Sequence, residues 1–253
     1  CFRITFNIKK AFWNIPVTFS ISNKYTKIKK IMEVFTLKTN YKVAIIGSTG
    51  LVGRTVLKVL EEKNFKNCTY TLFASKKSAG SKVQFLGQNY IIQELTEESF
   101  KFKFDYAIFC AGGSVSKKYI PIAVQSGCTV IDNSSVYRMD KNVPLVVPEV
   151  NPEKIFENKG IIANPNCSTI QAVVALKPLD DRYKIKRIVY STYQAVSGAG
   201  KAGIEDLENG MKGLAQKKFQ HPIFNNCLPH IDVFVSIYFR DKILLYHPGW
   251  RAV

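Results

Sequence analysis

The chain of 253 residues lacks the features that mark several specialised classes of protein. No uncharged apolar run reaches the roughly 18 residues that a membrane-spanning helix needs, so we expect no membrane association. The six cysteines lie at irregular spacings without a C-x-x-C pair, which argues against a disulfide framework and against a zinc site. We therefore predict a cytoplasmic protein with reduced thiols and no metal. Apolar residues make up 46% and charged residues 22%, as in an ordinary folded protein.

Acidic residues are scarce, with 19 Asp and Glu against 36 Lys and Arg, which gives a net charge of +17. Residues 1–32 contain seven Lys or Arg and no acid, so part of this excess lies at one end. Elsewhere the basic residues are scattered along the chain instead of forming one strip. A site for a phosphorylated metabolite needs no more positive charge than this, so we predict no nucleic-acid partner.

The two ends differ in character from the middle of the chain. Residues 1–40 form a basic, aromatic extension with no helical or strand period. Met32 precedes the first strong strand and resembles a natural start, so we expect residues 1–31 to be non-native or untranslated upstream sequence. The alternative is a transit peptide, which would also be basic and poor in acids. Residues 235–253 form a tail of different character.

Between the ends, short apolar runs alternate with segments of helical period. This pattern predicts strands at 41–46, 69–74, 105–110 and 129–132, helices at 51–60 and 116–125, and a hairpin over 83–95. A second series predicts strands at 160–163 and 187–193 and helices at 168–179 and 201–211. Such alternation is typical of the α/β class, and it predicts a Rossmann-like doubly wound parallel sheet followed by a second domain.

A glycine-rich segment, GSTGLVG, lies directly between the first predicted strand and helix, with glycine at Gly47, Gly50 and Gly53. Glycines at such a turn let backbone N–H groups approach a pyrophosphate at the start of the helix. The next strand ends in Ser75-Lys76-Lys77-Ser78, where an NAD-binding enzyme usually has an acid that binds the ribose. We therefore predict a dinucleotide site that favours NADP over NAD. The alternative for these lysines is a solvated pair in a loop.

Cys167 opens a predicted helix within the polar segment NPNCST. The positive end of a helix dipole favours a thiolate there, so we predict that Cys167 is a nucleophile. Free cysteines are more often buried structural residues. We predict that the remaining cysteines within the folded part are buried structural residues: Cys68, Cys110, Cys128 and Cys227.

Residues 41 to 234 resemble the aspartate-semialdehyde dehydrogenase family. The matching segments are AIIGSTGLVG, ASKKSAG, DNSSVYRMDKNVPLVVPEVN, NPNCSTIQ, STYQAVSGAG and LPHIDVF. The resemblance implies an NADP-binding domain over 41–165, an incomplete α+β catalytic and dimerisation domain over 166–234, and a homodimer. The implied reaction converts aspartate 4-semialdehyde, phosphate and NADP into aspartyl 4-phosphate and NADPH, on the route to lysine, methionine and threonine.

The family's functional residues carry over to several positions of this sequence. Cys167 would form the acyl-thioester, Gln194 would orient the substrate, and Asn166 would help to order the site. Arg138 would bind phosphate through its planar guanidinium. The positions that match cofactor contacts are Gly47, Thr49, Gly50, Leu51, Val52, Ser75, Lys77, Ser78, Ser197 and Gly198. The family often has Arg where Lys77 stands.

The resemblance is not complete at the C-terminal side. The family places a general-base histidine, a substrate-binding arginine and a phosphate-binding lysine in its last third, and none of them is matched here. The histidines of this chain, His221, His230 and His247, lie elsewhere. We therefore expect a truncated chain. The alternative to an active dehydrogenase is a catalytically inactive dinucleotide-binding remnant of the family.

Overall fold

The computed structural model describes residues 40–65, 67–190 and 192–228. The predictions made for residues 1–39 and 235–253, and for His230 and His247, lie outside this range. The chain divides into two units, a first unit that ends at Asn164 and a second unit that begins at Pro165.

The first unit is built on a six-stranded sheet in which every pair of neighbouring strands is parallel. The strand order is β5-β2-β1-β6-β7-β8, so the chain starts in the middle and adds strands first on one side and then on the other. This is the order 3-2-1-4-5-6 of a doubly wound sheet, which confirms the predicted fold class. The strands are β1 (Tyr41–Ile46), β2 (Cys68–Ala74), β5 (Gln93–Glu94), β6 (Tyr106–Phe109), β7 (Thr129–Asp132) and β8 (Ile161–Ala163).

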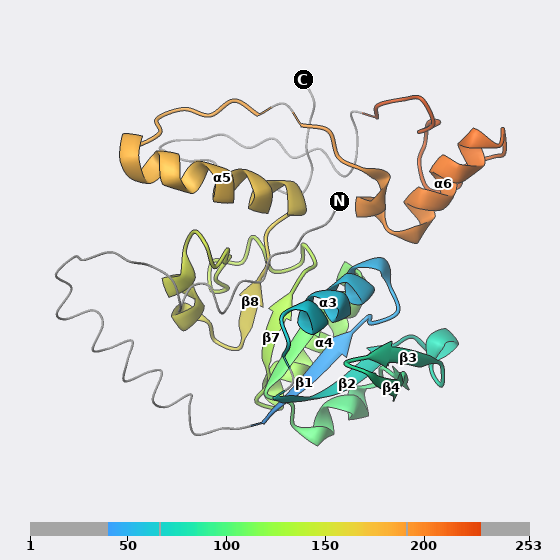
Figure 1. The fold of residues 1–253 in the computed structure, drawn as a ribbon, viewed down its shortest axis with the longest axis vertical. Coiled ribbons are helices and arrows are strands. Elements are labelled where there is room, and N and C mark those ends of the chain that lie inside the picture. The colour runs from blue at the N-terminus through green and yellow to red at the C-terminus, as the bar shows by residue number, and fades with distance from the viewer. Residues whose placement is uncertain (1–39, 66, 191, 229–253) are drawn as a thin grey trace. The chain divides into compact units, whose positions relative to one another are not determined.

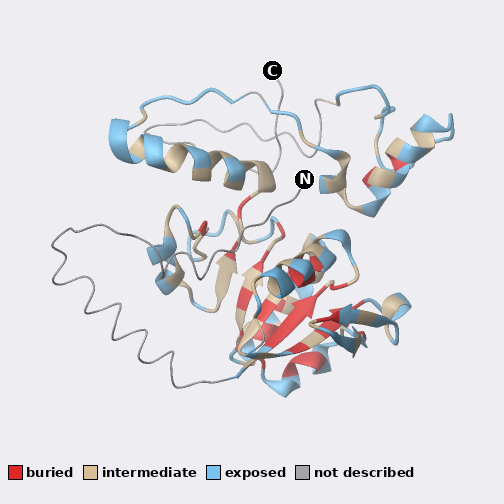
Figure 2. Cartoon of the chain, viewed as in Figure 1, coloured by how far each residue is buried: buried red, intermediate tan, exposed pale blue. Residues whose placement is uncertain are grey.

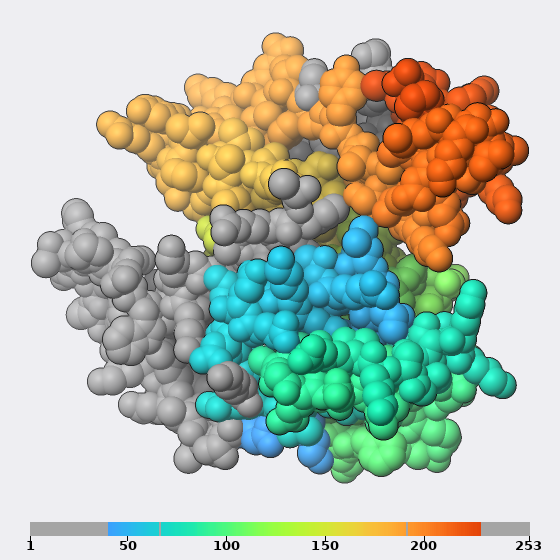
Figure 3. Space-filling model, turned by 45° about the vertical axis from the view of Figure 1, so that its right-hand side comes forward, coloured from blue at the N-terminus to red at the C-terminus, as the bar shows by residue number. Residues whose placement is uncertain are grey.

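Helices α3 (Leu51–Glu62) and α4 (Gly113–Gln125) follow β1 and β6 (Figure 1). The predicted hairpin is present as β3 (Lys82–Phe85) and β4 (Gln88–Ile91), although residues 93–94 join the main sheet as β5 instead of extending it. The hairpin turn lies against α3, because the Leu86 N–H donates a 2.6 Å hydrogen bond to the Glu61 carboxylate. Figure 3 shows the two elements adjoining on the surface of the first unit.

Apolar side chains from β1 fill both faces of the sheet. Val43 and Ile45 pack in one buried cluster, and Ala44 and Ile46 pack in the other. Successive residues of a strand point to opposite faces, so a continuous apolar run is what a strand covered on both sides requires. Figure 2 shows the resulting buried layer along the sheet.

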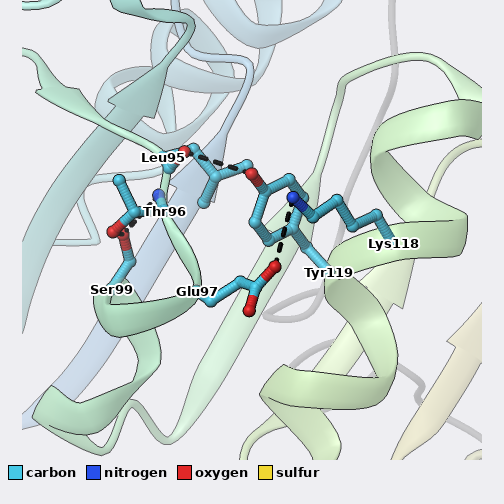
Figure 4. Close-up of polar contacts among 6 residues, drawn as sticks. All are labelled: Leu95, Thr96, Glu97, Ser99, Lys118 and Tyr119. Carbon is cyan, nitrogen blue, oxygen red and sulfur yellow. Dashed lines mark hydrogen bonds and ion pairs between the residues drawn. The ribbon is translucent and has the colours of Figure 1, made fainter.

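The 3₁₀ helix η2 (Glu97–Phe102) is joined to α4 by polar contacts (Figure 4). The Glu97 carboxylate lies 3.2 Å from Lys118 Nζ, and the Tyr119 hydroxyl donates to the Leu95 carbonyl at 3.4 Å. Both partners of the ion pair are more than half exposed, so the pair contributes only about 0–1 kcal/mol to stability. The apolar core, and not this surface contact, therefore fixes the position of α4.

The second unit contains α5 (Cys167–Tyr183), the 3₁₀ helix η4 (Val196–Ala199) and α6 (Lys201–Met211). Helix α6 agrees with the prediction for 201–211. The predicted strand at 187–193 is wrong, because its described residues form no strand. A strand needs a neighbour for its backbone N–H and C=O groups, and the described part of this unit contains none.

Candidate functional site

The glycine turn after β1 is fixed to the end of β2. The N–H groups of Gly47 and Ser48 both donate to the Phe73 carbonyl, at 2.9 and 3.1 Å. The buried Ser48 hydroxyl donates to the same carbonyl at 3.1 Å. Gly47 has φ +81°, and a Cβ on it would lie 2.9 Å from the Ala111 nitrogen. Both the conformation and the close approach therefore require glycine at this position.

Gly53 lets α3 begin directly against this turn. A Cβ on Gly53 would lie 2.2 Å from the Gly47 carbonyl oxygen, which no side chain can tolerate. Gly50 is the N-cap residue of α3, so Leu51 and Val52 form the first helical positions. The first turn of an α-helix leaves N–H groups without intrahelical partners and carries partial positive charge, so this geometry suits an anion such as a pyrophosphate.

The turn after β6 resembles the turn after β1, and sequence reasoning missed it. Cys110, Ala111 and Gly112 connect β6 to α4, which begins at Gly113. Strands β1 and β6 are neighbours at the centre of the sheet, where the strand order reverses. Ligands of doubly wound sheets bind in the crevice outside the carboxyl ends of the strands at this point. The Gly-Gly pair that follows the predicted strand at 105–110 was the available signal.

Ser75, Lys77 and Ser78 lie in the turn that follows β2. Ser75 is the N-cap of the 3₁₀ helix η1 (Lys76–Ser78), and its carbonyl accepts a 2.9 Å hydrogen bond from the Ser78 N–H. Lys77 is exposed. Because β2 is the parallel neighbour of β1, this turn lies at the same edge of the sheet as the glycine turn.

Arg138 lies where β7 and β8 end. Its Nε donates to the Asn164 carbonyl at 2.8 Å, and its Nη2 donates to the Asn133 carbonyl at 3.0 Å. These residues directly follow β8 and β7. The half-buried guanidinium is therefore held at the carboxyl edge of the sheet.

In the second unit, Cys167 is the first residue of α5, and Asn166 is its N-cap. The Asn166 side-chain oxygen accepts a 2.9 Å hydrogen bond from the Ser168 N–H. The Gln194 side-chain amide donates to Cys167 Sγ at 3.5 Å, although the two residues are 27 positions apart. The structure thus brings together the three residues predicted as catalytic: Asn166, Cys167 and Gln194.

The two predicted cofactor contacts of the second unit, Ser197 and Gly198, lie in η4. A Cβ on Gly198 would lie 3.2 Å from the Gln194 side-chain nitrogen. Gly198 therefore leaves room for the amide that contacts Cys167.

The other cysteines have different surroundings. Burial, with a smaller contribution from the Asp132 carboxylate, raises the pKa of Cys110 to about 12, and burial raises the pKa of Cys128 to about 12 as well. Cys68 and Cys110 are half-buried and Cys128 is buried, but Cys227 is exposed, so its predicted burial is wrong. Cys227 lies in irregular chain after α6, and the described residues of the second unit, 165–190 and 192–228, form no core that could bury it.

Over residues 40–65, 67–190 and 192–228, no group of three or more His, Cys, Asp and Glu side chains is arranged to hold a metal ion. Within the same ranges, none of the helices has the length and apolar character needed to cross a bilayer.

Two family descriptions match most of the described chain. Residues 42–158 match the NAD-binding domain of semialdehyde dehydrogenases, and residues 176–238 match their dimerisation domain. The aspartate-semialdehyde dehydrogenase of Aquifex aeolicus is 56% identical over 77% of this chain and 60% of its own length. The chain belongs to the semialdehyde dehydrogenase family. The enzyme of Bacillus subtilis is 47% identical over 76% of this chain and 59% of its own length.

Solved structures of semialdehyde dehydrogenases agree with this assignment. Aspartate semialdehyde dehydrogenase II of Vibrio cholerae, complexed with ASA, has a TM-score of 0.73 at 46% identity and covers 78% of this chain and 61% of its own. The Candida albicans enzyme with NADP has a TM-score of 0.50 at 29% identity, over 57% of this chain and 48% of its own. The chain thus spans about 60% of the length of the curated relatives that it matches.

Proposed function

We propose that this chain carries the cofactor-binding and thiol-bearing parts of an NADP-dependent aspartate-semialdehyde dehydrogenase. The observation that carries the proposal is the hydrogen bond from Gln194 to the Cys167 thiol at the start of α5, in a chain of this family. The reaction oxidises aspartate 4-semialdehyde with NADP in the presence of phosphate and gives aspartyl 4-phosphate and NADPH. It belongs to the biosynthesis of lysine, methionine, threonine and diaminopimelate in the cytoplasm.

In the proposed reaction, Cys167 is the nucleophile and Arg138 binds the phosphate. The Cys167 thiolate adds to the aldehyde carbon and forms a thiohemiacetal, whose carbon is then oxidised to a thioester. The Gln194 side-chain N–H and the first turn of α5 lie at the sulfur and hold it in place for this attack. A phosphate oxygen, bound by Arg138, attacks the thioester carbon and releases the Cys167 thiolate. The product is an acyl phosphate.

The dinucleotide has a site that fits it in the first unit. The cradle at Gly47 and Gly53 has no room for a Cβ, so backbone N–H groups can approach a pyrophosphate closely. When bound, NADP supplies the hydride acceptor. Lys77, with the hydroxyls of Ser75 and Ser78, provides cationic and hydrogen-bonding groups for a 2′-phosphate.

The cofactor preference is tested by titrating the chain with NADP and with NAD. NADP should bind more tightly, and Lys77→Glu should erase or reverse the preference because it places like charge beside the 2′-phosphate. Lys58→Glu, an equal charge change on the exposed side of α3, should leave the preference intact. Equal affinity of the unaltered chain for the two cofactors would refute this assignment and favour the solvated-lysine alternative.

The activity is tested by following NADPH formation from aspartate semialdehyde, NADP and phosphate with the purified chain. We expect formation that depends on phosphate and is abolished in Cys167→Ser, while NADP still binds. Binding without turnover in the unaltered chain would instead support the alternative, a dinucleotide-binding remnant.

We also propose that the chain forms a homodimer through the segment that matches the dimerisation domain. Val189 and Tyr193, which this segment leaves 75% and 86% exposed, are side chains that a partner subunit can cover. Sedimentation of the purified chain should give twice the mass of one copy, and Val189→Asp should return it to a monomer. A monomeric unaltered chain would refute the proposal.

A further inference from the structure

Asp132, the last residue of β7, is a wholly buried carboxylate that the steps above do not use. Its Oδ1 accepts hydrogen bonds from the Ser116 hydroxyl of α4, at 2.9 Å, and from the Ser134 N–H, at 3.0 Å. Its Oδ2 accepts a 2.7 Å bond from the Ser134 hydroxyl. Burial of a carboxylate costs several kcal/mol unless donors surround it. These donors come from α4 and from the segment that follows β7, so Asp132 joins the two.

The same hydrogen bonds continue into the segment 133–138. The Ser134 hydroxyl oxygen, held by Asp132, accepts the Val136 N–H at 3.2 Å. The Val136 side chain in turn lies close to α4, since a Cβ on Gly113 would be 3.2 Å from it. The backbone at Ser134 and at Val136 is therefore held in place before the segment reaches Arg138.

Arg138 is bound back to the residues beside Asp132. Its Nη2 donates to the Asn133 carbonyl, and its Nε donates to the Asn164 carbonyl. Asn164 itself is held by its N–H, which donates to the Asp132 carbonyl at 2.8 Å, and by its side-chain amide, which donates to the Asn133 side chain at 2.6 Å. The guanidinium is thus oriented by two carbonyls. One belongs to Asn133, the residue after Asp132, and the other to Asn164, whose N–H is hydrogen-bonded to the Asp132 carbonyl.

We propose that Asp132 is a positioning residue that sets the plane of the Arg138 guanidinium for an oxyanion, with inorganic phosphate as the ligand. The inference rests on the proposed phosphate role of Arg138. A guanidinium binds phosphate well only when its planar N–H groups are correctly oriented, and an error of about 0.5 Å weakens such a contact. Asp132 is fully buried and touches no substrate. It acts through the backbone of Asn133 and Asn164, whose carbonyls accept the hydrogen bonds of the Arg138 guanidinium.

The test is the rate at which phenylglyoxal modifies Arg138 in the full chain, measured by peptide mass at increasing concentrations of inorganic phosphate. In the unaltered chain, phosphate should slow the modification. Asp132→Asn keeps the shape of the side chain but replaces one acceptor oxygen with an N–H₂ group. We expect the phosphate concentration for half protection to rise about tenfold, as expected for loss of a hydrogen bond to a charged group. NADP affinity should stay unchanged, whereas general damage to the fold would weaken both ligands.

Three serine variants keep the proposal testable if Asp132→Asn does not fold. Ser134→Ala removes the hydroxyl that connects Asp132 to the Val136 N–H but leaves the carboxylate and its bond from the Ser134 N–H, so it should also weaken phosphate protection. Ser116→Ala breaks only the bond to α4 and should have a smaller effect. Ser126→Ala, which removes a hydroxyl bonded to the Ala123 carbonyl, is the matched control and should have none.

The possible outcomes separate this inference from the proposed function. If phosphate protects Arg138 equally in the unaltered chain, in Asp132→Asn and in Ser134→Ala, the positioning role of Asp132 is refuted and the phosphate role of Arg138 stands. If phosphate does not protect Arg138 even in the unaltered chain, the proposed phosphate role fails, and the inference fails with it. Weaker protection in the two variants, with NADP binding retained, supports both.

Discussion

The first unit and the described part of the second unit differ in how they hold their side chains in place. Among residues 40–65, 67–190 and 192–228, every buried aliphatic, aromatic or cysteine side chain lies between Val43 and Ala163, in the first unit. In the second unit, residues 165–190 and 192–228 include only three buried residues: Pro165, Gly203 and Asp206. Figure 2 shows the contrast between the buried sheet and the mostly intermediate or exposed helices.

The two candidate sites reflect this difference. The candidate cofactor site is made mainly of backbone, since its glycine turns and helix starts follow strands that a double-sided core holds rigidly. The thiol site is made of side chains, and its main tie is one amide–sulfur contact between Gln194 and Cys167. Helix α5 contains no buried residue, so local hydrogen bonds, and not packing, position its first residues within the described chain.

The largest contrast should appear in the reactivity of Cys128 in the first unit and Cys227 in the second. Burial moves the pKa of Cys128 from 9.0 to about 12, which lowers its thiolate fraction at neutral pH on the order of a thousandfold. Cys227 is exposed. Iodoacetamide labelling followed by peptide mass should therefore modify Cys227 on the order of a thousandfold faster. In urea, which opens the core, the two rates should converge. Similar rates in the folded chain would mean that the first unit does not enclose this thiol.

The second contrast concerns matched phenylalanines. Phe109 is fully buried, whereas Phe224 is 39% exposed. Phe109→Ala should lower the free energy of unfolding by about 3–5 kcal/mol, because it removes a large side chain and leaves a cavity. Phe224→Ala should lower it by less than about 1 kcal/mol. Urea titration followed by circular dichroism measures both, and equal losses would show that the second unit is packed as tightly as the first.

The third contrast compares Gly53, where a side chain would clash, with Gly112, where a side chain would have room; both glycines lie in the candidate cofactor site. Gly53→Ala places a Cβ 2.2 Å from a carbonyl oxygen and should cost about 1–3 kcal/mol of unfolding free energy, together with NADP binding. Gly112→Ala meets no atom within 4 Å and has an ordinary φ of −69°. We expect Gly112→Ala to cost less than about 1 kcal/mol. A mild effect of Gly53→Ala would show that α3 can move away from the turn.

Most of the first unit could be predicted from the sequence because its signals are local. The apolar run Tyr41–Ile46 needs a strand covered on both faces, and the glycine turn that follows it is typical of the connection from a strand to a helix. The strand predicted at 187–193 failed for the opposite reason. Its β-branched and aromatic residues have strand propensity, but a strand forms only with a partner, which propensity does not report.

The candidate sites show the same limit. Cys167 has a local signal at the start of a helix, whereas its contact with Gln194 spans 27 residues and was not predicted. Gln194 was identified as a site residue only through the family resemblance, as a residue that orients the substrate. Asp132 gave no signal at all, since an acid at the end of a strand is usually exposed. Its burial follows from the position of α4 over β7, which depends on the topology of the whole sheet.

We expect the smallest effect at Asp206, which is the one buried ionisable group among the described residues of the second unit. The Asp206 carboxylate of α6 accepts the N–H groups of Lys217, Lys218 and Phe219 at 2.7, 2.7 and 2.8 Å. Burial by itself raises the pKa of Asp206, but the three backbone donors outweigh it and leave the pKa below its usual value. Such a group stabilises the fold above its unfolded-state pKa, and the contribution is lost as pH falls through the lower, folded-state pKa.

Amide hydrogen exchange across 217–219, corrected for the intrinsic rate at each pH, should therefore show protection at neutral pH that declines in acid. In Asp206→Asn the protection should be weak and nearly independent of pH, because an amide has one acceptor oxygen and no titratable group in this range. Asp181→Asn is the matched control, since Asp181 is an exposed helix aspartate whose pKa is also lowered, chiefly by the Lys177 ammonium. It should leave 217–219 unchanged. Equal loss of protection in both variants would mean that helix charge in general, and not the carboxylate of Asp206, holds this segment against α6.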